Sequence, residues 1–101
     1  MKDKIIIHVN PDILDLVPGY ISHRKNDLPV IREHLVNNRF EEIRVIGHKM
    51  KGGGKLYNLE LVTILGDKIE NASIETNKPL IEKAVAELED YLERVEVVCN
   101  G

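Results

Sequence analysis

Residues 45–58, VIGHKMKGGGKLYN, place a histidine, three lysines and a run of three glycines in one short stretch. A glycine-rich loop can bind a phosphate through its backbone N–H groups, whereas a histidine on a helix can carry a phosphoryl group on its ring. The loop motif requires G-x-x-x-x-G-K-[ST] between a strand and a helix. Gly47 and Gly52 have the spacing of its two glycines, but Gly53 stands where the lysine belongs. The stretch is therefore not predicted to be a phosphate-binding loop.

The same stretch belongs to an amphipathic pattern that predicts a helix from Phe40 onward. At ~100° per residue, His48 projects about 150° from the centre of the apolar arc, so we expect it to face solvent. A neutral imidazole exposed in this way can act as a nucleophile without a dedicated base. The residues of the apolar arc recur mostly three, four or seven positions apart and are Phe40, Ile43, Ile46, Gly47, Met50, Gly54 and Tyr57.

Basic residues surround His48 on the predicted helix. Arg44 and Gly52 lie one turn away, and Lys51 and Lys55 lie on the adjoining rows. A dianionic group would be stabilised on such a face of an otherwise acidic chain. The alternative is an ordinary solvated helix face with a lone histidine among lysines. The other histidines fit that alternative, because none pairs with another at a metal-ligand spacing; they are His8, His23 and His34.

Two helices are predicted before this one. Asn10 as N-cap, followed by proline, predicts a short helix near residues 11–17. A second helix restarts at Pro18 and runs to about Asn37. Within it, Pro29 removes one intrahelical hydrogen bond, so we expect a kink, or a break into two helices, about three residues earlier.

Two further helices are predicted after the histidine. The segment YNLELVTILGDKIENA predicts one with Asn58 as N-cap, and the last begins around Asn77 to Pro79. Both ends of the chain, IIIHV and VEVVCN, are rich in β-branched residues and are also compatible with extended segments that pair. The two apolar stripes consist of Leu61, Leu65, Ile69 and Ala72, and of Ile81, Ala84, Val85, Leu88, Tyr91 or Leu92, and Val95.

Together these segments predict one all-α domain over residues 1–101, an antiparallel up-down four-helix bundle with a short additional N-terminal helix. With a net charge of -3 and a pI of 5.8, the chain lacks the excess of basic residues that is typical of a nucleic-acid-binding protein. The single cysteine, Cys99, excludes an intrachain disulfide and is consistent with a reducing cytosol. Because no segment approaches the ~20 apolar residues of a membrane span, and no signal-peptide core is found, we predict a cytoplasmic chain without membrane insertion.

The combination H-x-x-K-G in the middle of a bundle helix, formed by His48, Lys51 and Gly52, resembles the histidine-containing phosphotransfer (Hpt) domain family. The resemblance covers nearly the whole chain, through PGY in the initial helix, FEEIRVIGHKMKGGGKLYN, ILGDKIENA and LEDYLERVEVV, of which GHKMKG is the specific part. The family motif commonly continues to a glycine six residues after Gly52, where this chain has Asn58. Because asparagine can cap a helix or take a left-handed conformation, we expect this turn to survive with slight strain.

The resemblance implies an intermediate of a multistep phosphorelay. His48 would accept a phosphoryl group from a receiver-domain aspartate and pass it to another receiver. Lys51, one turn on, would offset part of the charge that develops during transfer. The residues expected at the docking surface for the receiver are Arg44, Lys49, Gly52 and Lys55.

The chain has no nucleotide-binding motif and no acidic metal cluster, and no general base is predicted beside His48. It is therefore predicted to be a phosphocarrier and not an enzyme. The resemblance implies that the receiver supplies the aspartate and a magnesium ion, so this chain would hold no cofactor and no metal. The expected partners are response-regulator receiver domains and a hybrid histidine kinase, and the expected state is a monomer.

Two other functions stay open on the sequence alone. The dimerisation and phosphoacceptor module of a sensor histidine kinase also carries a histidine on a bundle helix, but it is a helical hairpin that needs a second copy. A purely structural interaction bundle would show the same helix pattern and would not accept a phosphoryl group.

Overall fold

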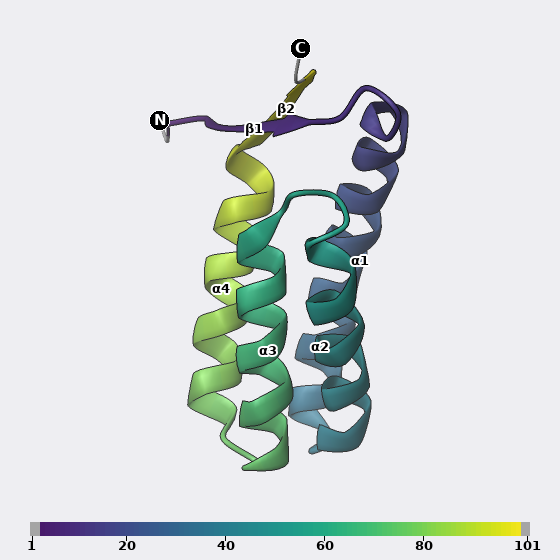
Figure 1. Ribbon diagram of the computed structural model, residues 1–101. Helices are drawn as coiled ribbons and strands as arrows, with labels where there is room; N and C mark the ends of the chain where they lie inside the picture. The colour runs from purple at the N-terminus through teal and green to yellow at the C-terminus, as the bar shows by residue number, and fades with distance from the viewer. Residues whose placement is uncertain (1–2, 100–101) are drawn as a thin grey trace.

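The computed structural model of the chain describes residues 3–99, which form four long helices and a small two-stranded sheet (Figure 1). Consecutive helices run in opposite directions alongside one another (Figure 1). Within the described residues, no helix combines the length and the apolar character that crossing a bilayer would need. In chain order the elements are β1 (Ile5–Val9), the 3-10 turn η1 (Leu14–Leu16), α1 (Val17–Val36), α2 (Phe40–Gly54), α3 (Glu60–Ile74), α4 (Lys78–Arg94) and β2 (Val95–Cys99).

The core consists of the apolar stripes that the four helices turn toward one another. The stripe predicted for the last helix is confirmed through Ile81, Val85 and Leu88, which are all buried, whereas its last member, Val95, begins β2. Burial of each large aliphatic side chain contributes about 1.5–3 kcal/mol, so packing, more than helix propensity, stabilises these helices. The largest fully buried side chains on the helices include Ile31, Ile43, Met50, Leu65, Ile69, Ile81 and Leu88.

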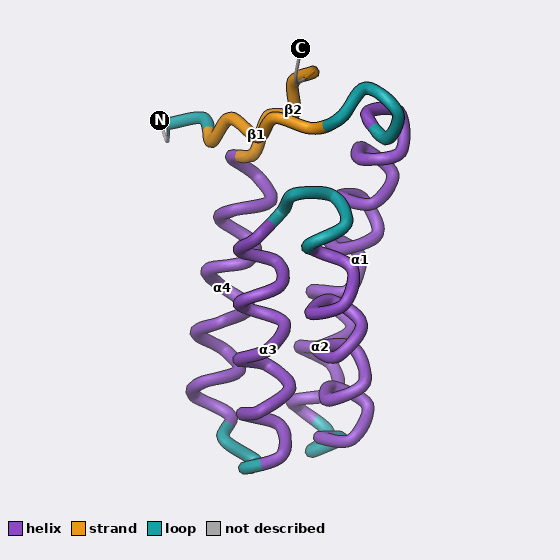
Figure 2. Tube along the Cα trace, in the orientation of Figure 1, coloured by secondary structure: helices purple, strands orange, loops and turns teal. Residues whose placement is uncertain are grey.

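The all-α prediction is wrong in one respect, since β1 and β2 pair in parallel. Ile5 lies opposite Val95, and Val9 lies opposite Cys99. Both strands lie across one end of the helices (Figure 2). A parallel pair requires a long connection, and here all four helices separate the two strands in sequence. The β-branched residues at both ends of the chain favour this extended pairing, which the sequence had left open.

The short helix expected near residues 11–17 is instead a turn followed by η1. The side-chain oxygen of Asn10 accepts a hydrogen bond from the Asp12 N–H at 2.8 Å, and its carbonyl accepts one from the Ile13 N–H at 3.0 Å. Asn10 therefore stabilises a turn and does not cap an α-helix. Of the kink or break expected near Asn26, the break into two helices is excluded, because α1 is continuous over Val17–Val36. Pro29 lies on the exposed face, where water can satisfy the carbonyl that loses its helical partner.

The connection between α2 and α3 differs from the prediction at two positions. Asn58 does not cap α3; it takes a left-handed conformation with φ of 59°, the alternative that asparagine tolerates well. Its side-chain amide donates a hydrogen bond to the His8 carbonyl at 2.7 Å, which ties this connection to β1. Because α2 ends at Gly54, Tyr57 lies beyond the helix and stacks on Tyr20 with ring centroids 4.3 Å apart.

Candidate functional site

His48 lies on the exposed face of α2, as expected, with 69% of its side chain accessible. The preceding residue, Gly47, is buried against α3, where an added Cβ would lie 2.8 Å from the Glu70 backbone nitrogen. Gly66 of α3 packs against α2 in the same way, because a Cβ there would lie 2.6 Å from the Lys51 backbone nitrogen. The two glycines let the backbones approach closely, and this approach brings side chains of α3 within reach of His48.

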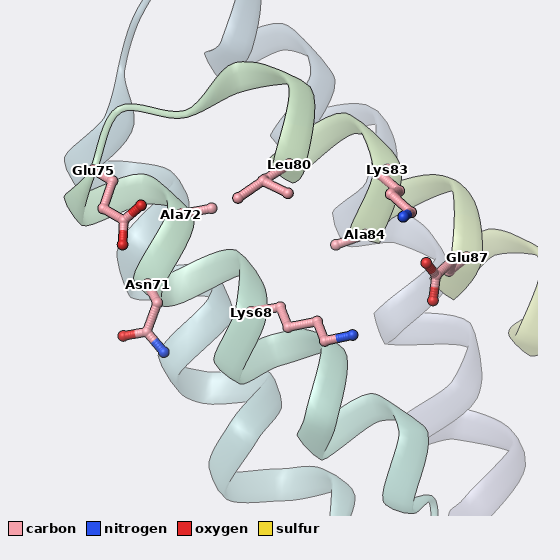
Figure 3. Close-up of a pocket in the computed structure, with 8 residues that line it drawn as sticks. All are labelled: Lys68, Asn71, Ala72, Glu75, Leu80, Lys83, Ala84 and Glu87. Atoms are coloured by element: carbon pink, nitrogen blue, oxygen red, sulfur yellow. The ribbon is translucent and has the colours of Figure 1, made fainter.

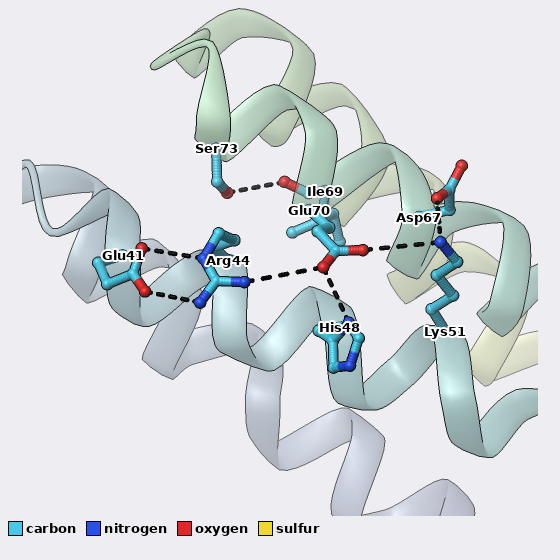
Figure 4. A network of polar contacts seen from close by, with 8 residues as sticks. All are labelled: Glu41, Arg44, His48, Lys51, Asp67, Ile69, Glu70 and Ser73. Atoms are coloured by element: carbon cyan, nitrogen blue, oxygen red, sulfur yellow. Dashed lines mark hydrogen bonds and ion pairs between the residues drawn. The ribbon is translucent and has the colours of Figure 1, made fainter.

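A carboxylate from α3 contacts the histidine. His48 Nδ1 lies 2.9 Å from Glu70 Oε2 (Figure 4). Only 13% of the Glu70 side chain is exposed, and two cations of α2 lie close to it. Arg44 Nη1 is 3.9 Å from Oε2, and Lys51 Nζ is 3.8 Å from Oε1. Glu70 is thus the common partner of three side chains on α2.

The contact with Glu70 assigns different roles to the two ring nitrogens of His48. An ionised carboxylate can only accept a hydrogen bond, so the hydrogen belongs on Nδ1. In the neutral imidazole, Nε2 then holds the free lone pair, and Figure 4 shows this nitrogen pointing away from Glu70. The nitrogen left available for reaction is therefore the outward-facing one.

Glu70 was missed as a site residue by the sequence reasoning, which expected no candidate general base beside His48, whereas the structure places a carboxylate in contact with its ring. The two residues are 22 positions apart, so no local motif connects them. One signal was present: Glu70 comes four residues after Gly66 and directly after Ile69 of the buried stripe. A glycine in a buried stripe indicates that another helix approaches closely. A carboxylate one turn away on the same helix would then lie within reach of that other helix.

The basic face expected around His48 is largely neutralised. The Arg44 guanidinium donates hydrogen bonds to both carboxylate oxygens of Glu41, at 2.9 and 2.6 Å, and this contact lowers the pKa of Glu41. Lys51 Nζ lies 3.0 Å from Asp67 Oδ1, and this hydrogen bond raises the pKa of Lys51. Together with the carboxylate that contacts the histidine, three anionic and two cationic side chains meet here (Figure 4).

The other predicted site residues lie outside this cluster. Gly52 is exposed, and an added Cβ would meet nothing within 4 Å. Lys49 is exposed on α2, whereas Lys55 follows the end of the helix. Gly54, placed by the sequence on the apolar arc, is buried, and a Cβ there would lie 2.7 Å from the Thr63 backbone nitrogen. The predicted contrast between an exposed Gly52 and a packed Gly54 is confirmed.

A hollow of about 310 Å³ lies between α3 and α4 (Figure 3). Ala72, Leu80 and Ala84 contribute apolar surface to it, and Lys68 and Glu87 contribute charge. None of the residues that line it belongs to the cluster around His48, so it is not part of the candidate site.

Comparisons of the chain with protein-family models, with curated proteins and with solved structures found no match.

Proposed function

We propose that the chain is a histidine-containing phosphotransfer domain, a phosphocarrier that accepts a phosphoryl group on His48 and passes it to another protein. The observation that carries the proposal is the exposed imidazole whose Nδ1 is held by Glu70 at 2.9 Å. The four antiparallel helices are consistent with the four-helix bundle of that family (Figure 1). The pattern H-x-x-K-G, with Lys51 one turn after the histidine, adds further support.

The proposed reaction is an in-line displacement at phosphorus. The Nε2 lone pair attacks an acyl phosphate; the N–P bond forms as the P–O bond breaks, and the donor aspartate leaves as a carboxylate. Positive charge develops on the ring, and the Glu70 carboxylate, hydrogen-bonded to Nδ1–H, stabilises it. Negative charge on the phosphoryl oxygens calls for a cation, and Lys51, half-exposed one turn away, is the side chain proposed to supply it.

The proposed partners are receiver domains that carry a phospho-aspartate. Gly52 leaves the helix surface one turn from His48 without a side chain, which gives a receiver room to approach. Lys49 and Lys55 are exposed and are proposed to attract its acidic pocket. Arg44 contributes less to this attraction than the sequence suggested, because Glu41 already binds it.

Two alternatives have weaker support. The dimerisation module of a sensor kinase needs a second copy to complete four helices, whereas this chain supplies four helices itself. A monomeric mass in solution would argue against that module. A purely structural bundle has no need for a largely shielded carboxylate that orients an exposed histidine.

Labelling with phosphoramidate tests the proposal without a partner protein, because this reagent can transfer its phosphoryl group to an imidazole and release ammonia. We expect one acid-labile phosphoryl group per chain, and none in His48→Gln. His23→Gln, which removes another exposed histidine of the helices, is the matched control and should label normally. Equal labelling of folded His48→Gln, or no labelling of the wild type by phosphoramidate or by a phosphorylated receiver, would overturn the assignment.

A further inference from the structure

Lys51 follows His48 by one turn, yet its ammonium group is held by carboxylates of α3. Nζ lies 3.0 Å from Asp67 Oδ1 and 3.8 Å from Glu70 Oε1. Figure 4 shows the Lys51 side chain reaching toward Asp67, on the side away from the outward-facing nitrogen of His48. In the unphosphorylated chain, Lys51 is thus directed away from the position where a phosphoryl group would be attached.

We propose that Asp67 is a positioning residue for Lys51 and that it weakens the interaction of Lys51 with a phosphoryl group on His48. This inference rests on the proposed function. A carboxylate and a phosphoryl group compete for the same ammonium group, so the stronger the bond to Asp67, the less Lys51 stabilises phosphohistidine. The phosphoryl group is then passed on more readily.

The exposure of the Lys51–Asp67 ion pair to water makes such an exchange feasible. The side chains of Lys51 and Asp67 are 48% and 43% exposed. An ion pair this accessible to water is weak, and a phosphoryl group with close to two negative charges can displace the carboxylate. Glu70, in contrast, is 13% exposed and bonded to His48 Nδ1, so it stays in place. Asp67 is therefore the partner that Lys51 exchanges.

Other cations on α2 are not placed to replace Lys51. The Arg44 guanidinium donates two hydrogen bonds to Glu41. Lys49 projects about 160° around the helix from Lys51, so it does not face Asp67. Competition between Asp67 and the phosphoryl group for Lys51 should therefore change the ionisation of the phosphoryl group.

The experiment follows the last ionisation of the phosphoryl group by phosphorus NMR, on chain phosphorylated with phosphoramidate. A cation beside the group favours its dianionic form and raises its acid dissociation constant. We expect Asp67→Asn to raise this constant about two- to fivefold, the range of a half-exposed ion pair. In a Lys51→Met background the same substitution should have a clearly smaller effect, since it then removes only the distant charge of Asp67.

Glu75→Gln is the matched control, because it makes the same change of charge about 12 Å away, at the residue that follows α3. An equal effect of Asp67→Asn with and without Lys51, or an effect no larger than that of Glu75→Gln, would overturn the role of Asp67. Asp67→Ser is a second variant if the first does not fold. If the wild type forms no phosphohistidine with phosphoramidate or a phosphorylated receiver, the proposed function and this inference both fail. If phosphohistidine forms and its titration is unmoved by Asp67→Asn, the inference alone fails.

Discussion

Glu70 is placed to orient the ring of His48 and to stabilise the charge that develops on it. Glu70→Ala removes a charge-assisted hydrogen bond, so phosphorylation by phosphoramidate should slow about tenfold. Glu70→Gln should retain part of the rate, because its amide oxygen can still accept from Nδ1–H. Asn71→Ala, on the exposed side of the same helix, is the control and should leave the rate unchanged. A normal rate in folded Glu70→Ala would show that the contact does not contribute to reactivity.

At the scale of single residues, the sequence identified the candidate acceptor and its exposure but not its immediate partners. The helical period placed His48 on the polar face, and the structure agrees. The carboxylates of Glu70 and Asp67 come from α3, the next helix along the chain, and their positions depend on the close approach of the two helices. Periodicity within one helix contains no information on which residues of another helix will face it.

Two glycines of α2 are expected to have different roles. Gly54 affects the stability of the helix packing, and Gly52 affects the access of a receiver to His48. Gly54 is packed against Thr63 and the Leu59 carbonyl, so Gly54→Leu should overpack the contact and cost ~1–3 kcal/mol. Gly52 has open space around it, so Gly52→Arg should keep or raise the melting temperature. The same arginine should sharply slow transfer from a receiver, because it occupies the surface one turn from His48.

Thermal unfolding and transfer kinetics on both variants test this separation. Gly52→Ala is the control, expected to gain up to ~1 kcal/mol of stability and to transfer at a rate close to wild type. An unstable Gly52→Arg, or one that transfers normally, would show that the docking surface lies elsewhere.

At the scale of elements, the four helices were predictable because each has a long apolar stripe with a period near 3.6. The start of the last helix around Asn77 to Pro79 was also predicted correctly, and the Asn77 side chain accepts a hydrogen bond from the Leu80 N–H there. Asn10 was misread as a helix cap, and of the two roles considered for Asn58 only the left-handed one is found, because asparagine stabilises turns and left-handed residues as readily as helix starts. The pairing of β1 with β2 joins the two ends of the chain, and a local pattern can only suggest that each end is extended.

At the scale of the whole molecule, charge steering should be present but small. The net charge is -3, and the cations nearest His48 are already paired with carboxylates. Raising the ionic strength shortens the Debye length from about 30 Å at 0.01 M to about 8 Å at physiological salt. Transfer from an acidic receiver should slow by less than about tenfold over this range.

Lys49 and Lys55 are the residues expected to cause this dependence on salt. A variant with both Lys49→Gln and Lys55→Gln should transfer more slowly at low salt and should show a flatter response. Replacing Lys68 and Lys83, which line the hollow between α3 and α4, is the control and should leave the salt response unchanged. A transfer rate independent of ionic strength in the wild type would mean that these lysines play no part in encounter.

His48 is proposed to carry the phosphoryl group on Nε2, the nitrogen that faces away from Glu70. Phosphorus–nitrogen correlation NMR on ¹⁵N-labelled chain, phosphorylated with phosphoramidate or by a receiver, identifies the bonded atom directly. The predicted result is a single phosphorus signal coupled to Nε2 of His48, absent from His48→Gln. A signal coupled to Nδ1 of His48, or to a nitrogen of His8, His23 or His34, would contradict the account.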